Sequence, residues 1–111
     1  MEKLIKQSDV NYFLSEIEQI FPNFVAGVLC DHHGFPIASK IPQNFHIQEN
    51  ILALSAISNK KDLIKGKKYL KIKRDLDKSK NVKLLLLLEK TKKRELYFEK
   101  LEKLIETQGL F

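Results

Sequence analysis

The apolar residues near the start of the chain repeat with the period of an α-helix. They occur at Val10, Phe13, Leu14, Ile17, Ile20 and Phe21. Spacings of three, four and seven residues place these side chains on one stripe of an amphipathic helix. Ser8 is a suitable N-cap, because its hydroxyl can accept a free backbone N–H of the first turn. Pro22 and Asn23 are expected to end this helix.

The next segment predicts a β-hairpin. Residues 24–30 are apolar on both faces of the pleat, which is typical of a well-buried strand. A turn cluster that ends in Gly34 follows, and residues 35–41 form a second strand. Pro36 cannot donate a hydrogen bond to a ladder, so the second strand is expected to start late or to lie at a sheet edge.

A second helix follows from Ile47 and is apolar around most of its circumference. Ile47, Ile51 and Leu54 could cover the sheet of the same chain. Leu52, Ala53, Ala56 and Ile57 then leave too few polar positions for a helix with one side in water. We therefore expect a second subunit to cover this helix. The predicted dimer interface comprises Leu52, Ala53, Ala56, Ile57, Leu70 and Ile72.

The second half of the chain predicts two strands and a helix. In residues 68–74, Leu70 and Ile72 alternate with Tyr69, Lys71 and Lys73, as in an edge strand with one wet face. A polar turn at 75–80 leads into a buried central strand at 81–88, and residues 91–107 form the last helix. The predicted core comprises Phe13, Leu14, Ile17, Val28, Leu29, Leu84, Leu86, Leu101 and Leu104.

These elements give the order α-β-β-α-β-β-α within a single domain that spans residues 1–111. The economical packing for this order is one antiparallel sheet with helices on both faces, an α/β fold of the α+β sandwich type.

Positive charge is concentrated in one part of the chain, which alters the expected partners. The chain carries a net charge of +6, and residues 60–83 alone hold 11 basic and 3 acidic side chains, a net +8. This stretch fits a solvated surface, a docking face for an acidic partner or a membrane, or a nucleic-acid site. Nucleic acid is disfavoured, because Tyr69 is the only aromatic residue and Arg74 the only arginine there. The predicted docking patch comprises Lys67, Lys68, Lys71, Lys73 and Arg74.

The sequence lacks a motif for catalysis or for a cofactor. The single cysteine, Cys30, cannot form an intramolecular disulfide and lies in an apolar strand, which favours an inert, buried thiol. Asp31, His32 and His33 are neighbours on a turn, so their side chains diverge and are not expected to bind a metal. The chain also lacks a phosphate-binding loop. We therefore predict a protein without catalytic, metal or cofactor-binding residues.

The arginines are considered as catalytic helpers, and the apolar runs as targeting or membrane segments. Arg74 and Arg94 are the only candidates for an arginine finger, and both are expected to be structural or solvated. Residues 1–7 contain no apolar run that resembles a signal peptide. The longest apolar run, Leu84–Leu88, is far shorter than the roughly 20 residues of a membrane span. These features predict a cytoplasmic protein.

Three segments are similar to the Roadblock (dynein light chain) family. They are Val25–Asp31, Gly34–Ser39 and the Ile/Ala/Leu-rich helix Ile51–Ile57. Family members show a strand that ends in Asp, a Gly turn, a strand of the type Gly-apolar-Pro-Ile-Ala-Ser, and an alanine-rich helix. The family usually has three strands between its second and last helices, whereas two are evident here. Either one strand is lost, or a short extra one lies in Asp75–Lys80.

The resemblance implies a Roadblock/longin-like sheet and a non-catalytic role. Members of the family form homodimers or heterodimers, scaffold or regulate Ras-like small GTPases, anchor signalling complexes, or belong to dynein. One bacterial member activates a GTPase without a catalytic residue of its own. The resemblance therefore predicts a dimeric scaffold or regulator that binds a small GTPase or a larger complex. The alternative is a basic adaptor for an anionic membrane or a nucleic acid.

Overall fold

The structure, a computed structural model, describes residues 6–57, 69–89 and 95–111. It contains three helices and four strands in the order that the sequence predicts. The elements are α1 (Gln7–Ile20), β1 (Phe24–Asp31), β2 (Pro36–Lys40), α2 (Glu49–Ile57), β3 (Tyr69–Asp75), β4 (Val82–Glu89) and α3 (Glu95–Thr107). Among the described residues, no helix is long and apolar enough to cross a membrane.

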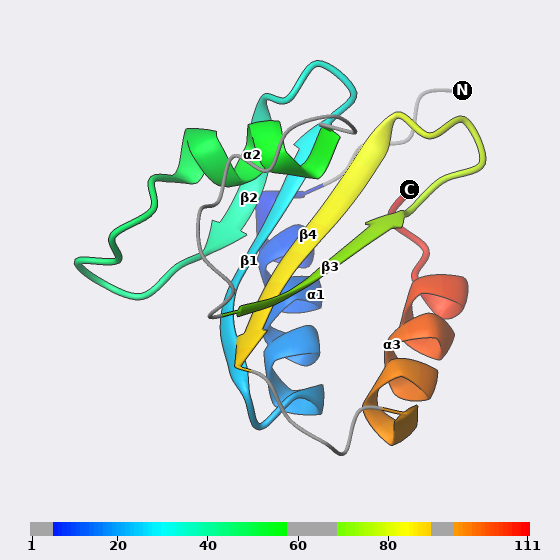
Figure 1. Cartoon of the computed structure of the whole chain (residues 1–111). Coiled ribbons are helices and arrows are strands. Elements are labelled where there is room, and N and C mark those ends of the chain that lie inside the picture. The colour runs from blue at the N-terminus through cyan, green and yellow to red at the C-terminus, as the bar shows by residue number, and fades with distance from the viewer. Residues whose placement is uncertain (1–5, 58–68, 90–94) are drawn as a thin grey trace.

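The four strands form one antiparallel sheet in the order β2-β1-β4-β3 (Figure 1). The two apolar strands, β1 and β4, are central, and Pro36 opens the edge strand β2, as predicted. Leu29 pairs with Leu84, and Leu86 pairs with Ile72. Since successive side chains point to opposite faces, the leucine run of β4 supplies the cores on both sides of the sheet.

Helices α1 and α3 cover one face of the sheet. Their apolar stripes meet the even-numbered leucines of β4, as the helical period requires. The buried residues of this larger core are Val10, Phe13, Leu14, Ile17, Phe21, Leu29, Ala38, Ile72, Leu76, Leu84, Leu86, Leu88 and Leu101. The predicted core residues are buried, except that Leu104 is only partly buried against this cluster and Val28 belongs to the opposite face.

Helix α2 covers the opposite face (Figure 1). The side chains between α2 and the sheet are mostly small, which lets the helix approach the strands closely. The buried residues of this second core are Ala26, Val28, Cys30, Leu52, Ala53, Ala56, Leu85 and Leu87.

Two aspartates fix the turns of the hairpins. Asp31 Oδ1 accepts hydrogen bonds from the backbone N–H groups of His33 and Phe35, at 2.9 and 3.0 Å. Asp77 Oδ1 accepts from those of Asn81 and Val82, at 2.9 and 3.0 Å. Because Asp77 closes a turn directly after β3, residues 75–80 hold no additional strand.

The helix starts differ from the sequence prediction. Helix α1 begins at Gln7, and its N-cap residue is Lys6, whose side chain makes no capping bond. Ser8 therefore lies inside the helix and is not the cap. Helix α2 begins at Glu49, two residues after the predicted start. The predicted start of the last helix falls in residues 90–94, outside the described residues.

Candidate interaction surfaces

The predicted interface residues on α2 face this chain's own sheet. Leu52 is 1% exposed and Ala53 is fully buried, and Ala56 is buried with them. All three pack against side chains of β1 and β4. A contact surface for a second subunit on α2 must therefore lie on the opposite side of the helix. The circumference of this helix is too uniformly apolar for the sequence to fix which side faces inward.

The two interface residues predicted on β3 also point inward. Leu70 pairs with Leu88 and Ile72 with Leu86, so both side chains lie on the α1/α3 face. Ile72 is buried and Leu70 partly buried in that core. Of the predicted interface residues, only Ile57 lies at the rim of α2, where it is partly buried.

An exposed apolar surface does exist beside α2, and it includes residues that the sequence did not indicate. Leu54 is 41% exposed, and Phe35 in the β1–β2 turn is 67% exposed. The turn glycine, Gly34, brings the two elements together, because a Cβ at this position would lie 3.1 Å from Leu54 Cδ2 and 3.0 Å from Ile57 Cδ1. We call Phe35, Leu54 and Ile57 the turn–helix patch.

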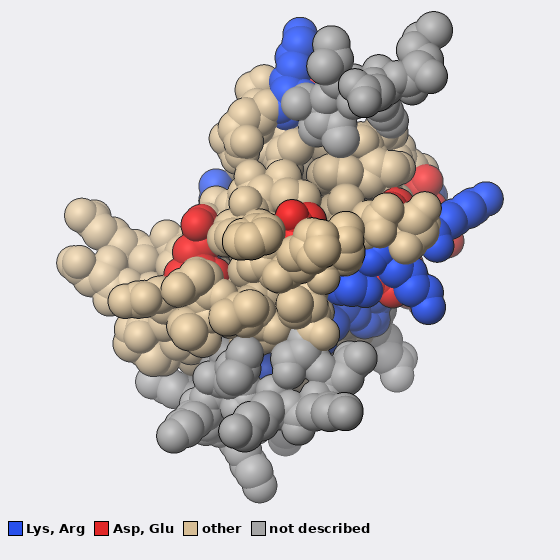
Figure 2. All heavy atoms as spheres, turned by 90° about the horizontal axis from the view of Figure 1, so that it is seen from above, with Lys and Arg blue, Asp and Glu red and all other residues tan. Residues whose placement is uncertain are grey.

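Charge is distributed unevenly around this surface. Figure 2 looks down on the end of the molecule that carries the β1–β2 turn, and much of the surface toward α2 is uncharged. The Lys and Arg side chains gather on the other side of the view, toward β3 and β4. Figure 2 therefore shows that the basic side chains at this end of the molecule are concentrated on one side of it.

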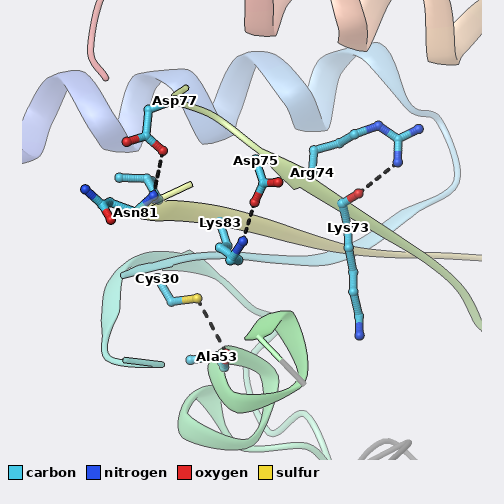
Figure 3. A network of polar contacts seen from close by, with 9 residues as sticks. Cys30, Ala53, Lys73, Arg74, Asp75, Asp77, Asn81 and Lys83 are labelled. Carbon is cyan, nitrogen blue, oxygen red and sulfur yellow. Dashed lines mark hydrogen bonds and ion pairs between the residues drawn. The ribbon is translucent and has the colours of Figure 1, made fainter. Parts of the chain in front are cut away.

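The predicted basic patch divides between two faces of β3. Lys71 and Lys73 project on the α2 side, whereas Arg74 projects toward α3, where its Nε lies 2.5 Å from Glu102 Oε1. Figure 3 shows Lys73 and Arg74 on opposite sides of the strand. Lys67 and Lys68 lie outside the described residues. The basic side chains of β3 therefore do not form one continuous docking face.

A small basic hollow lies between α2 and the β3–β4 pair. It has a volume of about 150 Å³ and is lined by Ala56, Lys73, Arg74, Asp75 and Lys83. Lys83 forms an ion pair with Asp75 (Figure 3). Lys73 and Lys83 bring two cationic groups to this side and Asp75 brings one carboxylate, whereas the Arg74 guanidinium lies on the other face beside Glu102. The hollow can therefore attract a single carboxylate or phosphate group. The sequence did not single out Lys83, because its place on the α2 face depends on the register of β4.

The thiol of Cys30 is held in a setting that opposes ionisation. Its Sγ lies 3.5 Å from the carbonyl oxygen of Ala53 (Figure 3). Burial and the neighbouring Asp31 carboxylate raise the pKa of the Cys30 thiol to about 11. A thiol with this pKa is protonated at neutral pH and is a poor nucleophile.

Asp31 serves the turn. The hydrogen bonds from the N–H groups of Phe35 and His33 keep the pKa of its carboxyl below the usual value, so the side chain stays ionised at neutral pH. The rings of His32 and His33 are exposed and lie beside each other, with centroids 3.9 Å apart. Within the described ranges, no three His, Cys, Asp or Glu side chains converge as a metal site would require. Arg94 lies outside these ranges.

The comparisons with known proteins add no identification. No protein-family model, curated protein or solved structure matches the chain. The residues that the structure describes form an α+β fold with a four-stranded antiparallel sheet and three helices.

Proposed function

We propose that this protein is a non-catalytic binding domain that associates with a second, related chain through the turn–helix patch. The observation that carries the proposal is that two exposed apolar side chains occur at neighbouring places, Phe35 directly after Gly34 in the turn and Leu54 on α2 where its Cδ2 approaches Gly34. Exposed apolar side chains that gather on a surface mark protein-interaction sites. The partner in the simplest arrangement is another copy of the chain, and a heterodimer with a related chain is the alternative.

The proposal extends to the partner of the dimer. Because the sequence resembles the Roadblock family, we propose that the dimer binds a small Ras-like GTPase or a larger signalling or motor complex, as a scaffold or regulator. An antiparallel sheet with helices on both faces supports this proposal. The described residues hold two strands between α2 and α3, whereas the family usually has three. The link to a GTPase depends on family analogy and not on residues of the site.

The association can be tested by measuring mass in solution. Light scattering after size exclusion should give the mass of a dimer for the wild type and a lower mass for Phe35→Ser or Leu54→Glu. Tyr12→Ser is the matched control, because Tyr12 is equally exposed at 67% but lies on the α1/α3 face. A monomeric wild type at high protein concentration would remove the homodimer. A heterodimer would then require a second chain in the assay.

Binding to a GTPase is tested separately. A panel of purified Ras-like GTPases, each loaded with GDP or with a non-hydrolysable GTP analogue, would be immobilised and exposed to the protein. A preference for one nucleotide state is expected of a regulator, and binding to both states is expected of a tether. The absence of binding to every member would remove this part of the proposal for the GTPases tested.

A second candidate function is an adaptor for anionic surfaces, favoured by the hollow that Lys73 and Lys83 line. Its test is sedimentation with vesicles that contain phosphatidylserine, at increasing salt. Binding governed by lysine–phosphate contacts should weaken steeply as salt rises. Lys73→Glu should reduce it, whereas Lys100→Glu, an exposed change on α3, should not. Absence of binding at low salt would eliminate this candidate.

A further inference from the structure

A groove lies between α1 and α3, on the face opposite the turn–helix patch. Figure 1 shows the two helices beside each other, with the segment after α3 near the start of α1. The groove has a volume of about 340 Å³, near the lower limit of about 300 Å³ for ligand pockets. Its lining includes Asp9, Tyr12 and Glu16 from α1, and Leu104 and Leu110 from the opposite wall.

One wall of this groove is fixed by a single side chain. Gln108 Oε1 accepts hydrogen bonds from the backbone N–H groups of Leu110 and Phe111, at 2.9 and 3.0 Å. Its Nε2 donates to the carbonyl oxygen of Leu76 at 3.0 Å. These bonds fold the segment 108–111 against the core and anchor it to the end of β3. The groove is therefore largely formed before any partner binds, which lowers the entropic cost of binding.

The rim of the groove is acidic, although the chain as a whole is basic. Asp9, Tyr12 and Glu16 lie on one side of α1, because they are three, four and seven residues apart. No Lys or Arg is among the lining residues. Within the described part of the chain, neither carboxylate has an ion-pair partner, unlike Asp75 and Glu102. Exposed charges are screened over about 8 Å at physiological salt, so the attraction of these two carboxylates acts mainly on a ligand in the groove itself.

We propose that this groove binds a segment of a partner protein that presents a Lys or Arg side chain next to an apolar one. The cation would pair with the Glu16 carboxylate and contact the exposed ring of Tyr12, and Asp9, about two helical turns away, would add attraction at longer range. The apolar neighbour would cover Leu104 and Leu110. This site is independent of the proposed dimer, since it lies on the other face and uses none of the residues of the turn–helix patch.

The test uses peptides of defined chemistry. One pool of seven-residue peptides carries a fixed central arginine with Leu, Ile or Phe on either side, and a matched pool carries glutamate instead. Titration into ¹⁵N-labelled protein should move the amide signals of Tyr12 and of residues 104–110 with the arginine pool only. Equal shifts with both pools, or no shift with the arginine pool, would overturn the proposal.

Variants locate the binding. Glu16→Gln keeps the shape of the side chain and should weaken binding about tenfold, the size expected for one charge-assisted hydrogen bond. Tyr12→Ser should weaken it as well. Glu99→Gln on α3 and Phe35→Ser are controls that should leave it unchanged. Unaltered binding by Glu16→Gln would contradict the proposal. A change in solution mass with Glu16→Gln would show that the groove holds a second copy of this chain, which would also overturn it.

Discussion

The thiol of Cys30 on β1 lies 3.5 Å from the carbonyl oxygen of Ala53 on α2. This contact joins the thiol of a central strand to the backbone of the helix that covers it, and the small, buried Ala53 side chain lets the helix come close to the strand. The same contact removes the thiol from solvent. The packing of α2 on the sheet thus also determines how accessible the thiol of Cys30 is.

We expect Cys30 to be unreactive in the folded protein. With its pKa raised to about 11 from a usual 9.0, the thiol is almost entirely protonated at pH 8. Labelling with a thiol-specific reagent at pH 8 should be much slower than after denaturation in urea. The pKa of the thiol is higher in the folded protein than in the unfolded chain. The contribution of the thiol to the free energy of unfolding is therefore fully present below pH 9 and declines as pH rises toward 11. Rapid labelling of the native protein at pH 8 would contradict this assignment.

The Asp31 carboxylate should make the β1–β2 turn sensitive to acid. Its folded pKa lies below the usual 3.8, because the N–H groups of Phe35 and His33 donate to the ionised form. Its contribution is therefore present above pH 3.8 and is lost as pH falls through the folded pKa. Urea titrations between pH 2 and pH 5 should show a steeper loss of stability below pH 3.8 for the wild type than for Asp31→Asn. The amide retains an acceptor oxygen but does not ionise, so identical slopes would exclude this role.

Sequence patterns predicted the elements and their order. The stripe of α1 has the single period of a helix. The five leucines of β4 fit a helix as well as a strand, and the polar turn before them favours a strand. The same patterns predicted the part of the larger core that comprises Phe13, Leu14, Ile17, Leu29, Leu84, Leu86 and Leu101. They did not predict Ile72, which was expected at an interface, or Leu76, which was expected in a polar turn. The inward position of Leu70 and Ile72 follows from their pairing with Leu88 and Leu86, which a single strand does not disclose.

The candidate surfaces could not be predicted from sequence to the same extent. In α2, leucine, isoleucine and alanine occur on all sides, so periodicity does not distinguish Leu52 from Leu54. The turn–helix patch also needs Phe35, which follows Gly34 in the chain, and Gly34 comes close to Leu54 and Ile57 of α2 only in the folded structure. The α1/α3 groove depends on the hydrogen bonds of Gln108, a residue that no sequence pattern singles out.

Paired substitutions on α2 should reveal its inward side. Ala53→Leu adds three carbon atoms at a fully buried site, and overpacking of this kind costs about 1–3 kcal/mol. Leu54→Gln alters an exposed position and should cost less than about 1 kcal/mol. The measurement is urea unfolding at one low protein concentration, because association would stabilise the folded state and obscure the comparison. A larger loss of stability for Leu54→Gln than for Ala53→Leu would show that Leu54, and not Ala53, faces the sheet.

The turn glycine should be essential to both stability and the turn–helix patch. Gly34 has a φ of +88°, a conformation that costs residues with a Cβ about 1–2 kcal/mol. A Cβ there would also press on Ile57 and Leu54, at 3.0 and 3.1 Å. Gly34→Ala should therefore lower the free energy of unfolding by at least about 1 kcal/mol. Gly109→Ala is the control, since a Cβ there meets no atom within 4 Å.

If self-association uses the turn–helix patch, Gly34→Ala should also weaken the dimer in light scattering at concentrations where the chain stays folded, and Gly109→Ala should not. Equal stability of the two variants would show that the turn does not require the left-handed conformation.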